Sequence, residues 1–168
     1  MCPGRMLADF INDGHGPGLS RGLQIIEAAA ASGAHAVKLQ TYTPDTMTLK
    51  GVITIEDKDS LWYGRELYDL YQEAYTPWEW HEELFALARD MGVLPFSSPF
   101  DLTAVDFLES LNAPMYKIAS LESGDHALIR AVAETGKPVI ISTGATEWEE
   151  IEELVSVVRE TGNKNLTL

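Results

Sequence analysis

Hydrophobic and polar positions along the chain follow two alternating periods. Short runs of apolar and β-branched residues predict strands, and segments with apolar residues at i, i+3, i+4 and i+7 predict amphipathic helices. The predicted strands are 6–11, 36–42, 93–99, 115–120, 139–144 and 165–168. The predicted helices are 19–32, 102–111 and 126–135, with two more that begin after Thr76 and Thr146; the apolar stripe of the first reaches Met91, and the second ends at Gly162. Strands that alternate with helices of this length are typical of a parallel sheet.

Two of the helix starts carry a recognisable cap. Both helix starts match a capping box, in which the threonine side chain accepts from the backbone N–H of the glutamate and the glutamate side chain accepts from the backbone N–H of the threonine. The two segments are Thr76-Pro77-Trp78-Glu79 and Thr146-Glu147-Trp148-Glu149. The stretch 43–75 is less regular and predicts an inserted loop with a short helix near 66–74. Long loops in compact domains are often functional.

Two architectures fit this order of elements: an open, doubly wound sheet and part of an eight-stranded barrel. No glycine-rich dinucleotide fingerprint follows a strand, which disfavours the first. Polar residues instead recur at the carboxyl ends of the strands, where barrel enzymes place their chemistry. We therefore predict an α/β fold, a partial TIM (β/α)8 barrel of about five βα units plus the start of a sixth strand. A whole barrel needs about 250 residues, so the 168 residues are expected to be part of a longer barrel.

Charge narrows the possible partners. The chain has 12 basic and 26 acidic residues, for a formal net charge of −14. This sign argues against a nucleic-acid partner and against an anionic membrane surface. No run of about 18 apolar residues predicts a membrane span. Cys2 is the single cysteine, so no internal disulfide is expected, and a cytoplasmic location fits best.

Two lysines stand inside apolar strands. Lys38 lies between Val37 and Leu39, and Lys117 lies between Tyr116 and Ile118. A lysine in a covered sheet is costly unless its charge is paired. Three explanations remain open: a salt bridge to a carboxylate such as Glu122 or Asp101, an anion site in which both ammonium groups bind a phosphate or carboxylate, and a Schiff-base lysine.

Hydroxyl groups accompany these lysines. Ser98, Ser120 and Ser142 lie near the ends of three successive strands, where they could donate to an anionic ligand. Glu122 follows Ser120 by two residues and is either a general acid or base or a carboxylate at a helix start. The four histidines do not show metal-ligand spacing, and His15, in a glycine-rich loop, is the one histidine that remains a candidate for a functional role.

Several segments resemble the sialic acid synthase family, which includes the N-acetylneuraminate synthases. The resemblance runs from about residue 19 to the end, and LWYGRELYDLY and TPWEWH are more particular to the pseudaminic acid branch of the family. The segments are AVKLQTYTPDT (36–46), LWYGRELYDLY (61–71), TPWEWH (76–81), PFSSPFDLTAVDFLESLNAP (95–114), YKIASLE (116–122) and GKPVIISTGA (136–145).

The resemblance implies a barrel enzyme that condenses phosphoenolpyruvate with an amino sugar and releases phosphate. In the pseudaminic acid branch the sugar is a diacetamido-trideoxy-altrose. C3 of phosphoenolpyruvate attacks the sugar aldehyde, water adds at C2, and phosphate leaves with C–O cleavage. The resemblance also implies a divalent metal, typically manganese but alternatively magnesium or cobalt, and a homodimer. Two alternatives remain: the N-acetylneuraminate specificity, and a non-catalytic fragment that retains at most anion binding.

The resemblance also implies roles for individual residues, and it makes the Schiff base less favoured. Glu122 corresponds to a catalytic carboxylate beside the reacting carbons, and Gln40 to a residue near the sugar. The remaining positions correspond to ligands of phosphoenolpyruvate: Lys38, Ser98, Lys117, Ser120 and Ser142.

The chain departs from the family pattern in two places. The family's first strand ends in Ala-Glu-(Ile/Leu) followed by Asn-His-Asn-Gly, whereas here Asp9 is the nearest carboxylate and His15 aligns with the histidine. The family's two metal-binding histidines lie later than Leu168. We therefore expect residues 1–168 to be the N-terminal portion of the barrel, without metal ligands, the rest of the barrel or the C-terminal antifreeze-like (SAF) domain.

Overall fold

Six parallel strands form one sheet in the computed structural model, which describes residues 7–9 and 18–168. Each strand pairs with its neighbour in the sequence, in the order β1-β2-β3-β4-β5-β6. An open doubly wound sheet reverses its strand order at a switch point, whereas a barrel does not. The consecutive order therefore confirms the partial barrel. The strands are β1 Leu7–Asp9, β2 Ala36–Thr41, β3 Leu94–Pro99, β4 Tyr116–Ile118, β5 Val139–Ile141 and β6 Leu166–Thr167.

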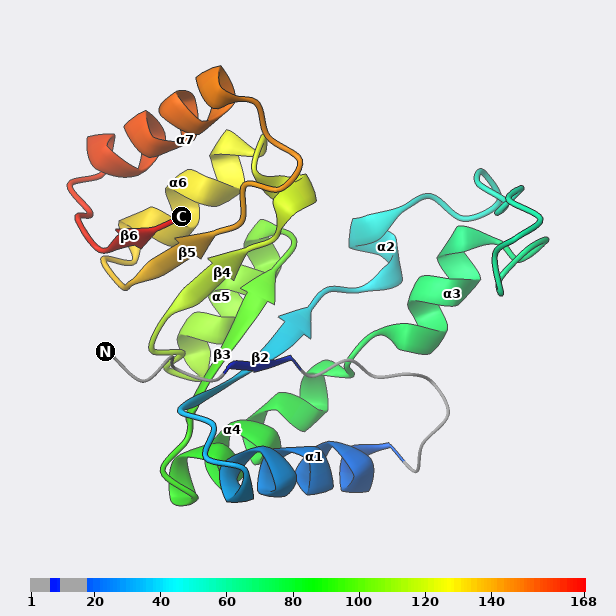
Figure 1. The fold of residues 1–168 in the computed structure, drawn as a ribbon, viewed down its shortest axis with the longest axis horizontal. Helices are drawn as coiled ribbons and strands as arrows, with labels where there is room; N and C mark the ends of the chain where they lie inside the picture. The colour runs from blue at the N-terminus through cyan, green and yellow to red at the C-terminus, as the bar shows by residue number, and fades with distance from the viewer. Residues whose placement is uncertain (1–6, 10–17) are drawn as a thin grey trace.

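Five helices pack along the sheet, as the apolar periodicity predicts. Figure 1 shows α1 and α4 side by side at one end and α6 and α7 at the other, and both pairs are in contact. The sheet residues that face the helices are almost fully buried, among them Leu39, Ile118 and Ile141. These helices are α1 Leu19–Ala31, α4 His81–Asp90, α5 Leu102–Ser110, α6 His126–Glu134 and α7 Trp148–Glu160.

An excursion of the chain, residues 42–80, separates β2 from α4. It contains α2 (Pro44–Met47), α3 (Leu67–Ala74) and a 3-10 turn at Trp78–Trp80. Figure 1 shows α2, α3 and the loop between them projecting away from the sheet. The helix predicted near 66–74 is thus confirmed, and α2 is an addition that the sequence pattern did not reveal. α3 is attached to the sheet through Tyr42, whose ring meets those of Tyr71 and Phe100 edge-on at 5.7 and 5.5 Å.

The capping box predicted at Thr76 is wrong. α4 is preceded by the 3-10 turn, and the turn's N-cap Pro77 makes no side-chain cap hydrogen bond. Contacts outside the local sequence determine this geometry. Trp78 stacks on Phe107 with ring centroids 4.7 Å apart, and its indole N–H donates to the carbonyl of Tyr42 at 3.2 Å.

The capping box predicted at Thr146 is displaced by one residue. The N-cap of α7 is Glu147, whose backbone N–H donates to Oε2 of Glu150 at 2.7 Å. Thr146 is engaged elsewhere, because its hydroxyl lies 2.8 Å from Oγ of Ser123. Within the described ranges, no helix has the length and apolar character needed to cross a membrane.

Candidate active site

The alternation of side chains along a strand separates the candidate residues from the core. Leu39 faces the helices, so its neighbours Lys38 and Gln40 face the opposite side of the sheet. In the parallel register Gln40 lies beside Ser98. Lys117 lies beside Ile140, on the strand that follows. The sheet therefore brings Lys38, Gln40, Ser98 and Lys117 to one face, as the sequence predicted.

Burial distinguishes two of these side chains. Lys38 is only 7% exposed, and Ser98 is 1% exposed. Oγ of Ser98 is buried and has no hydrogen-bond partner among the described residues. A buried hydroxyl without a partner costs free energy that a bound ligand could recover. This orphaned donor marks the inner end of the candidate site.

Glu122 is the carboxylate of the site. It ends a 3-10 turn, Ser120–Glu122, that follows β4, so Ser120 is not part of the strand as predicted. Burial raises the pKa of the Glu122 carboxyl above its usual value, while the positive charge of Lys117 acts in the opposite direction. Oε2 of Glu122 is buried without a hydrogen-bond partner in the described part of the chain. Glu122 and Lys117 are thus electrostatic neighbours, and burial makes the carboxyl hold its proton more readily than an exposed glutamate does.

Ser120 keeps its hydroxyl proton available. Its Oγ accepts a hydrogen bond from the backbone N–H of Ala145 at 2.9 Å, which leaves the O–H free to donate. Gly144 passes so close that a Cβ there would lie 3.4 Å from the same oxygen. Ser142 follows β5 directly, and its backbone N–H donates to the carbonyl of Ile118 at 3.1 Å. The two serines therefore lie on adjacent loops.

A second pair of hydroxyls joins these loops, and no pattern in the sequence predicted it. Ser123 donates to the carbonyl of Ser120 at 2.7 Å. Since its only proton is used there, the bond of 2.8 Å to Thr146 must be donated by the threonine. Ser123 is 5% exposed. The Ser123–Thr146 bond fixes the turn that carries Ser120 and Glu122 relative to the loop after β5.

Asp101 has a structural task. Its Oδ1 accepts from the backbone N–H groups of Thr103 at 2.7 Å and Ala104 at 3.1 Å, at the start of α5. This is an N-cap, which stabilises a helix by about 1 kcal/mol. One oxygen of the carboxylate that the sequence suggested as a partner for a strand lysine is therefore used at a helix terminus, and Oδ2 is buried without a hydrogen-bond partner among the described residues.

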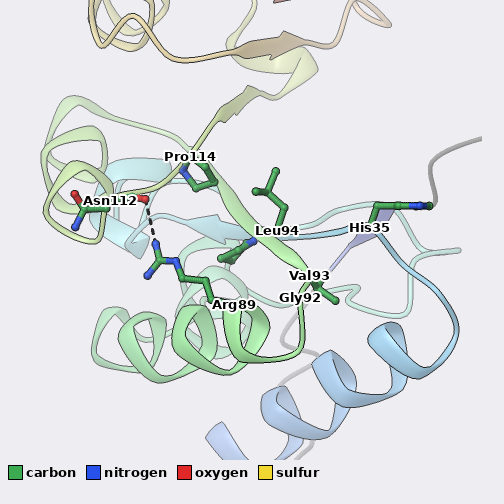
Figure 2. Close-up of a pocket in the computed structure, with 8 residues that line it drawn as sticks. His35, Arg89, Gly92, Val93, Leu94, Asn112 and Pro114 are labelled. Atoms are coloured by element: carbon green, nitrogen blue, oxygen red, sulfur yellow. Dashed lines mark hydrogen bonds between the residues drawn. The ribbon is translucent and has the colours of Figure 1, made fainter.

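A pocket of about 460 Å³ lies at the other end of the strands (Figure 2). It is lined by residues just before β2 and β4 and around the start of β3, among them His35, Leu94 and Pro114. Arg89 donates to the carbonyls of Leu111 at 2.7 Å and Asn112 at 3.1 Å, so its guanidinium ties the turn before β4. None of the candidate site residues lines this pocket, and we place the candidate site at the carboxyl ends of the strands.

The described residues do not fit a divalent metal. Within residues 7–9 and 18–168, no group of three or more His, Cys, Asp or Glu side chains could hold a metal ion. His15 lies outside the described residues. Asp9 lies in β1, where its backbone pairs with Lys38.

Comparisons with known proteins show the family of the chain. The family model of the NeuB family matches residues 25–168. The chain belongs to the NeuB family. Pseudaminic acid synthase of Helicobacter pylori is 44% identical over 170 residues, which cover 99% of this chain and 49% of that protein. N,N'-diacetyllegionaminic acid synthase of Campylobacter jejuni is 30% identical over 92% of this chain and 47% of its own length.

A solved relative extends the agreement to three dimensions. The sialic acid synthetase of Leptospira borgpetersenii, solved in complex with citrate, superposes with a TM-score of 0.80 at 25% identity. The match covers 95% of this chain and 51% of that one. The chain thus spans about half the length of the NeuB relatives it matches. These relatives are enzymes that make nonulosonic acids.

Proposed function

We propose that this chain forms part of a pseudaminic acid synthase, which condenses phosphoenolpyruvate with a diacetamido-trideoxy-altrose and releases phosphate. The observation that carries the proposal is the electrostatic interaction of Lys117 with Glu122, together with the buried, unpartnered hydroxyl of Ser98 on the strand adjacent to Lys117. Identity of 44% to a pseudaminic acid synthase favours this branch over the legionaminic acid synthases at 30%.

The binding half of the reaction uses charge. Phosphoenolpyruvate carries a phosphate and a carboxylate, and Lys38 and Lys117 supply positive charge on the strand face of a chain whose net charge is −14. Hydrogen bonds from ammonium groups to such oxygens are charge-assisted and short. The two lysines would bind the phosphate and the carboxylate, and the hydroxyls of Ser98, Ser120 and Ser142 would fix the orientation of phosphoenolpyruvate.

The bond-forming half requires a sugar and a proton carrier. C3 of phosphoenolpyruvate bonds to the sugar aldehyde carbon, whose oxygen takes a proton. Water then bonds to C2 and releases a proton, and the C2–O bond breaks so that phosphate leaves. Gln40 lies on the same face as Lys38 and would bind the sugar. Glu122, whose raised pKa lets it hold a proton, would transfer protons at the reacting carbons.

Titration calorimetry with phosphoenolpyruvate tests the proposal. Lys117→Met should weaken binding by about 10- to 150-fold, since a hydrogen bond to a charged group contributes about 1.5–3 kcal/mol. Lys164→Met is the matched control, because Lys164 is exposed at the opposite end of the sheet and carries the same charge. Equal affinities for the two variants would refute the assignment of Lys117.

Phosphate release distinguishes the remaining possibilities. The chain is incubated with phosphoenolpyruvate, manganese and either the diacetamido-trideoxy-altrose or N-acetylmannosamine. Release with the first sugar alone supports the pseudaminic acid specificity, and release with the second supports the N-acetylneuraminate type. Binding without release by either sugar would limit the chain's own activity to anion binding.

A further inference from the structure

A buried chain of hydrogen bonds lies behind the candidate site, on the helix-facing side of the sheet. Oγ1 of Thr41 is 2.9 Å from Nε2 of His81 and 2.7 Å from Oγ of Ser97. Nδ1 of His81 is 3.2 Å from the carbonyl of Pro77. Thr41, His81 and Ser97 have no exposed surface. His81 belongs to the TPWEWH segment, to which the proposed reaction gives no role.

The direction of every hydrogen bond in this chain can be assigned. The carbonyl of Pro77 only accepts, so Nδ1 of His81 carries the proton. Burial lowers the pKa of His81 to about 4, so the ring is neutral at pH 7 and Nε2 accepts. Thr41 must then donate to Nε2 and accept from Ser97. The order is Ser97 to Thr41 to His81 to Pro77, with each proton used once.

These residues hold the two strands that carry the site. Thr41 directly follows Gln40, and Ser97 directly precedes Ser98. Gln40 and Ser98 are register partners on the opposite face. The side-chain bond from Ser97 to Thr41 therefore joins β2 and β3 next to the residues of the candidate site, in addition to the backbone pairing of the two strands.

We propose that Ser97, Thr41 and His81 form a positioning relay, which ties the carboxyl ends of β2 and β3 to the first turn of α4 and thereby sets Gln40 and Ser98 in place for the substrates. The effect of the relay on substrate binding rests on the proposed function, whereas its hydrogen bonds are independent of that function. It binds no substrate atom. Its members act through Gln40 and Ser98, because Thr41 adjoins Gln40 in β2 and Ser97 adjoins Ser98 in β3.

The test removes one hydroxyl and preserves shape. Thr41→Val deletes the central bond, and Thr41→Ser restores it. Thr135→Val is the matched control, since Thr135 donates to the carbonyl of Val132 at 2.7 Å at the end of α6, before β5 and therefore at the end of the sheet opposite the candidate site. Calorimetric affinity for phosphoenolpyruvate is measured under conditions where urea titration shows all variants fully folded.

Thr41→Val is expected to weaken phosphoenolpyruvate binding by about fivefold or more, whereas Thr41→Ser and Thr135→Val remain within about twofold of the wild type. Nitrogen-15 spectra should show the ring of His81 protonated at Nδ1 and not at Nε2. Wild-type affinity in Thr41→Val, or a proton on Nε2, would overturn the relay.

Hydrogen exchange separates this failure from failure of the proposed function. If the wild-type chain does not bind phosphoenolpyruvate, the substrate assignment has failed and the relay is judged without ligand. Thr41→Val should then speed exchange at the amides of Gln40 and Ser98 by about fivefold or more, with no such change in Thr135→Val. Unchanged exchange at both amides would refute the relay by itself.

Discussion

Two adjacent serines in β3 offer a direct test of the site, because they are equally buried and differently bonded. Ser97 is fully buried and its hydroxyl bonds to Thr41 at 2.7 Å. Ser98 is 1% exposed, and its Oγ has no partner in the described residues. Truncation of each to alanine should therefore change the free energy of unfolding in opposite directions.

The magnitudes follow from the state of each hydroxyl. A buried polar group without a partner costs about 1–3 kcal/mol, so Ser98→Ala should raise the free energy of unfolding of the ligand-free chain by up to that amount. For a chain of this size, each kcal/mol raises Tm by about 2–4 °C. Ser97→Ala loses a satisfied hydrogen bond and should lower the free energy of unfolding by about 0.5–1.5 kcal/mol.

Ser98→Ala should bind phosphoenolpyruvate more weakly even though it is more stable. A lost hydrogen bond to a charged ligand is worth about 1.5–3 kcal/mol, which corresponds to about 10- to 150-fold in Kd. Urea unfolding followed by tryptophan fluorescence gives the stability, and titration calorimetry gives the affinity. If Ser98→Ala is less stable than the wild type, or binds phosphoenolpyruvate equally well, the hydroxyl is not held for a ligand.

Three further predictions concern single groups. Burial raises the pKa of Glu122 in the folded state above its ordinary value of 4.5, so the wild type should lose stability as pH rises from 4.5. Urea titrations at successive pH values should show this loss in the wild type and not in Glu122→Gln. The same pH dependence of stability in both proteins would contradict the prediction. Burial lowers the pKa of His81 from 6.5 to about 4, so stability that is present above pH 6.5 should be lost on acidification toward pH 4. The free energy of unfolding of the wild type should fall by about 3 kcal/mol more than that of His81→Gln. An equal fall in both proteins would refute this prediction. Asp101→Ala should lower the free energy of unfolding by about 0.5–2 kcal/mol through loss of the α5 cap, whereas Asp106→Ala, an exposed position within α5, should change it by less than about 0.5 kcal/mol; equal effects would argue against the cap.

The sheet could be predicted from the sequence because each strand and helix is specified by its own apolar pattern. Polar residues at the carboxyl ends of the strands, Lys38 and Lys117 among them, could be located in the same way, whereas the face on which they lie follows from the burial of Leu39 and Ile118 in the structure. The consecutive strand order then confirmed the barrel over the open sheet.

What the sequence could not predict depends on contacts between distant residues. Thr76 and Thr146 have the local chemistry of helix caps, but stacking of Trp78 on Phe107 and the bond from Thr146 to Ser123 prevail. The relay was missed in the same way. A polar residue at a helix-facing strand position, such as Thr41, is the signal that could have revealed it, because such a hydroxyl needs a buried partner.

The length of the excursion after β2 has a consequence for the order of folding. Residues 42–93 connect β2 to β3, whereas residues 100–115 connect β3 to β4. A connection about three times as long costs about 1 kcal/mol more loop-closure entropy. We expect β3 to β6 to associate first and the β1–α1–β2 unit to join them late. Phosphoenolpyruvate would then slow unfolding of the finished chain without accelerating its folding, since its site is completed only in the last step.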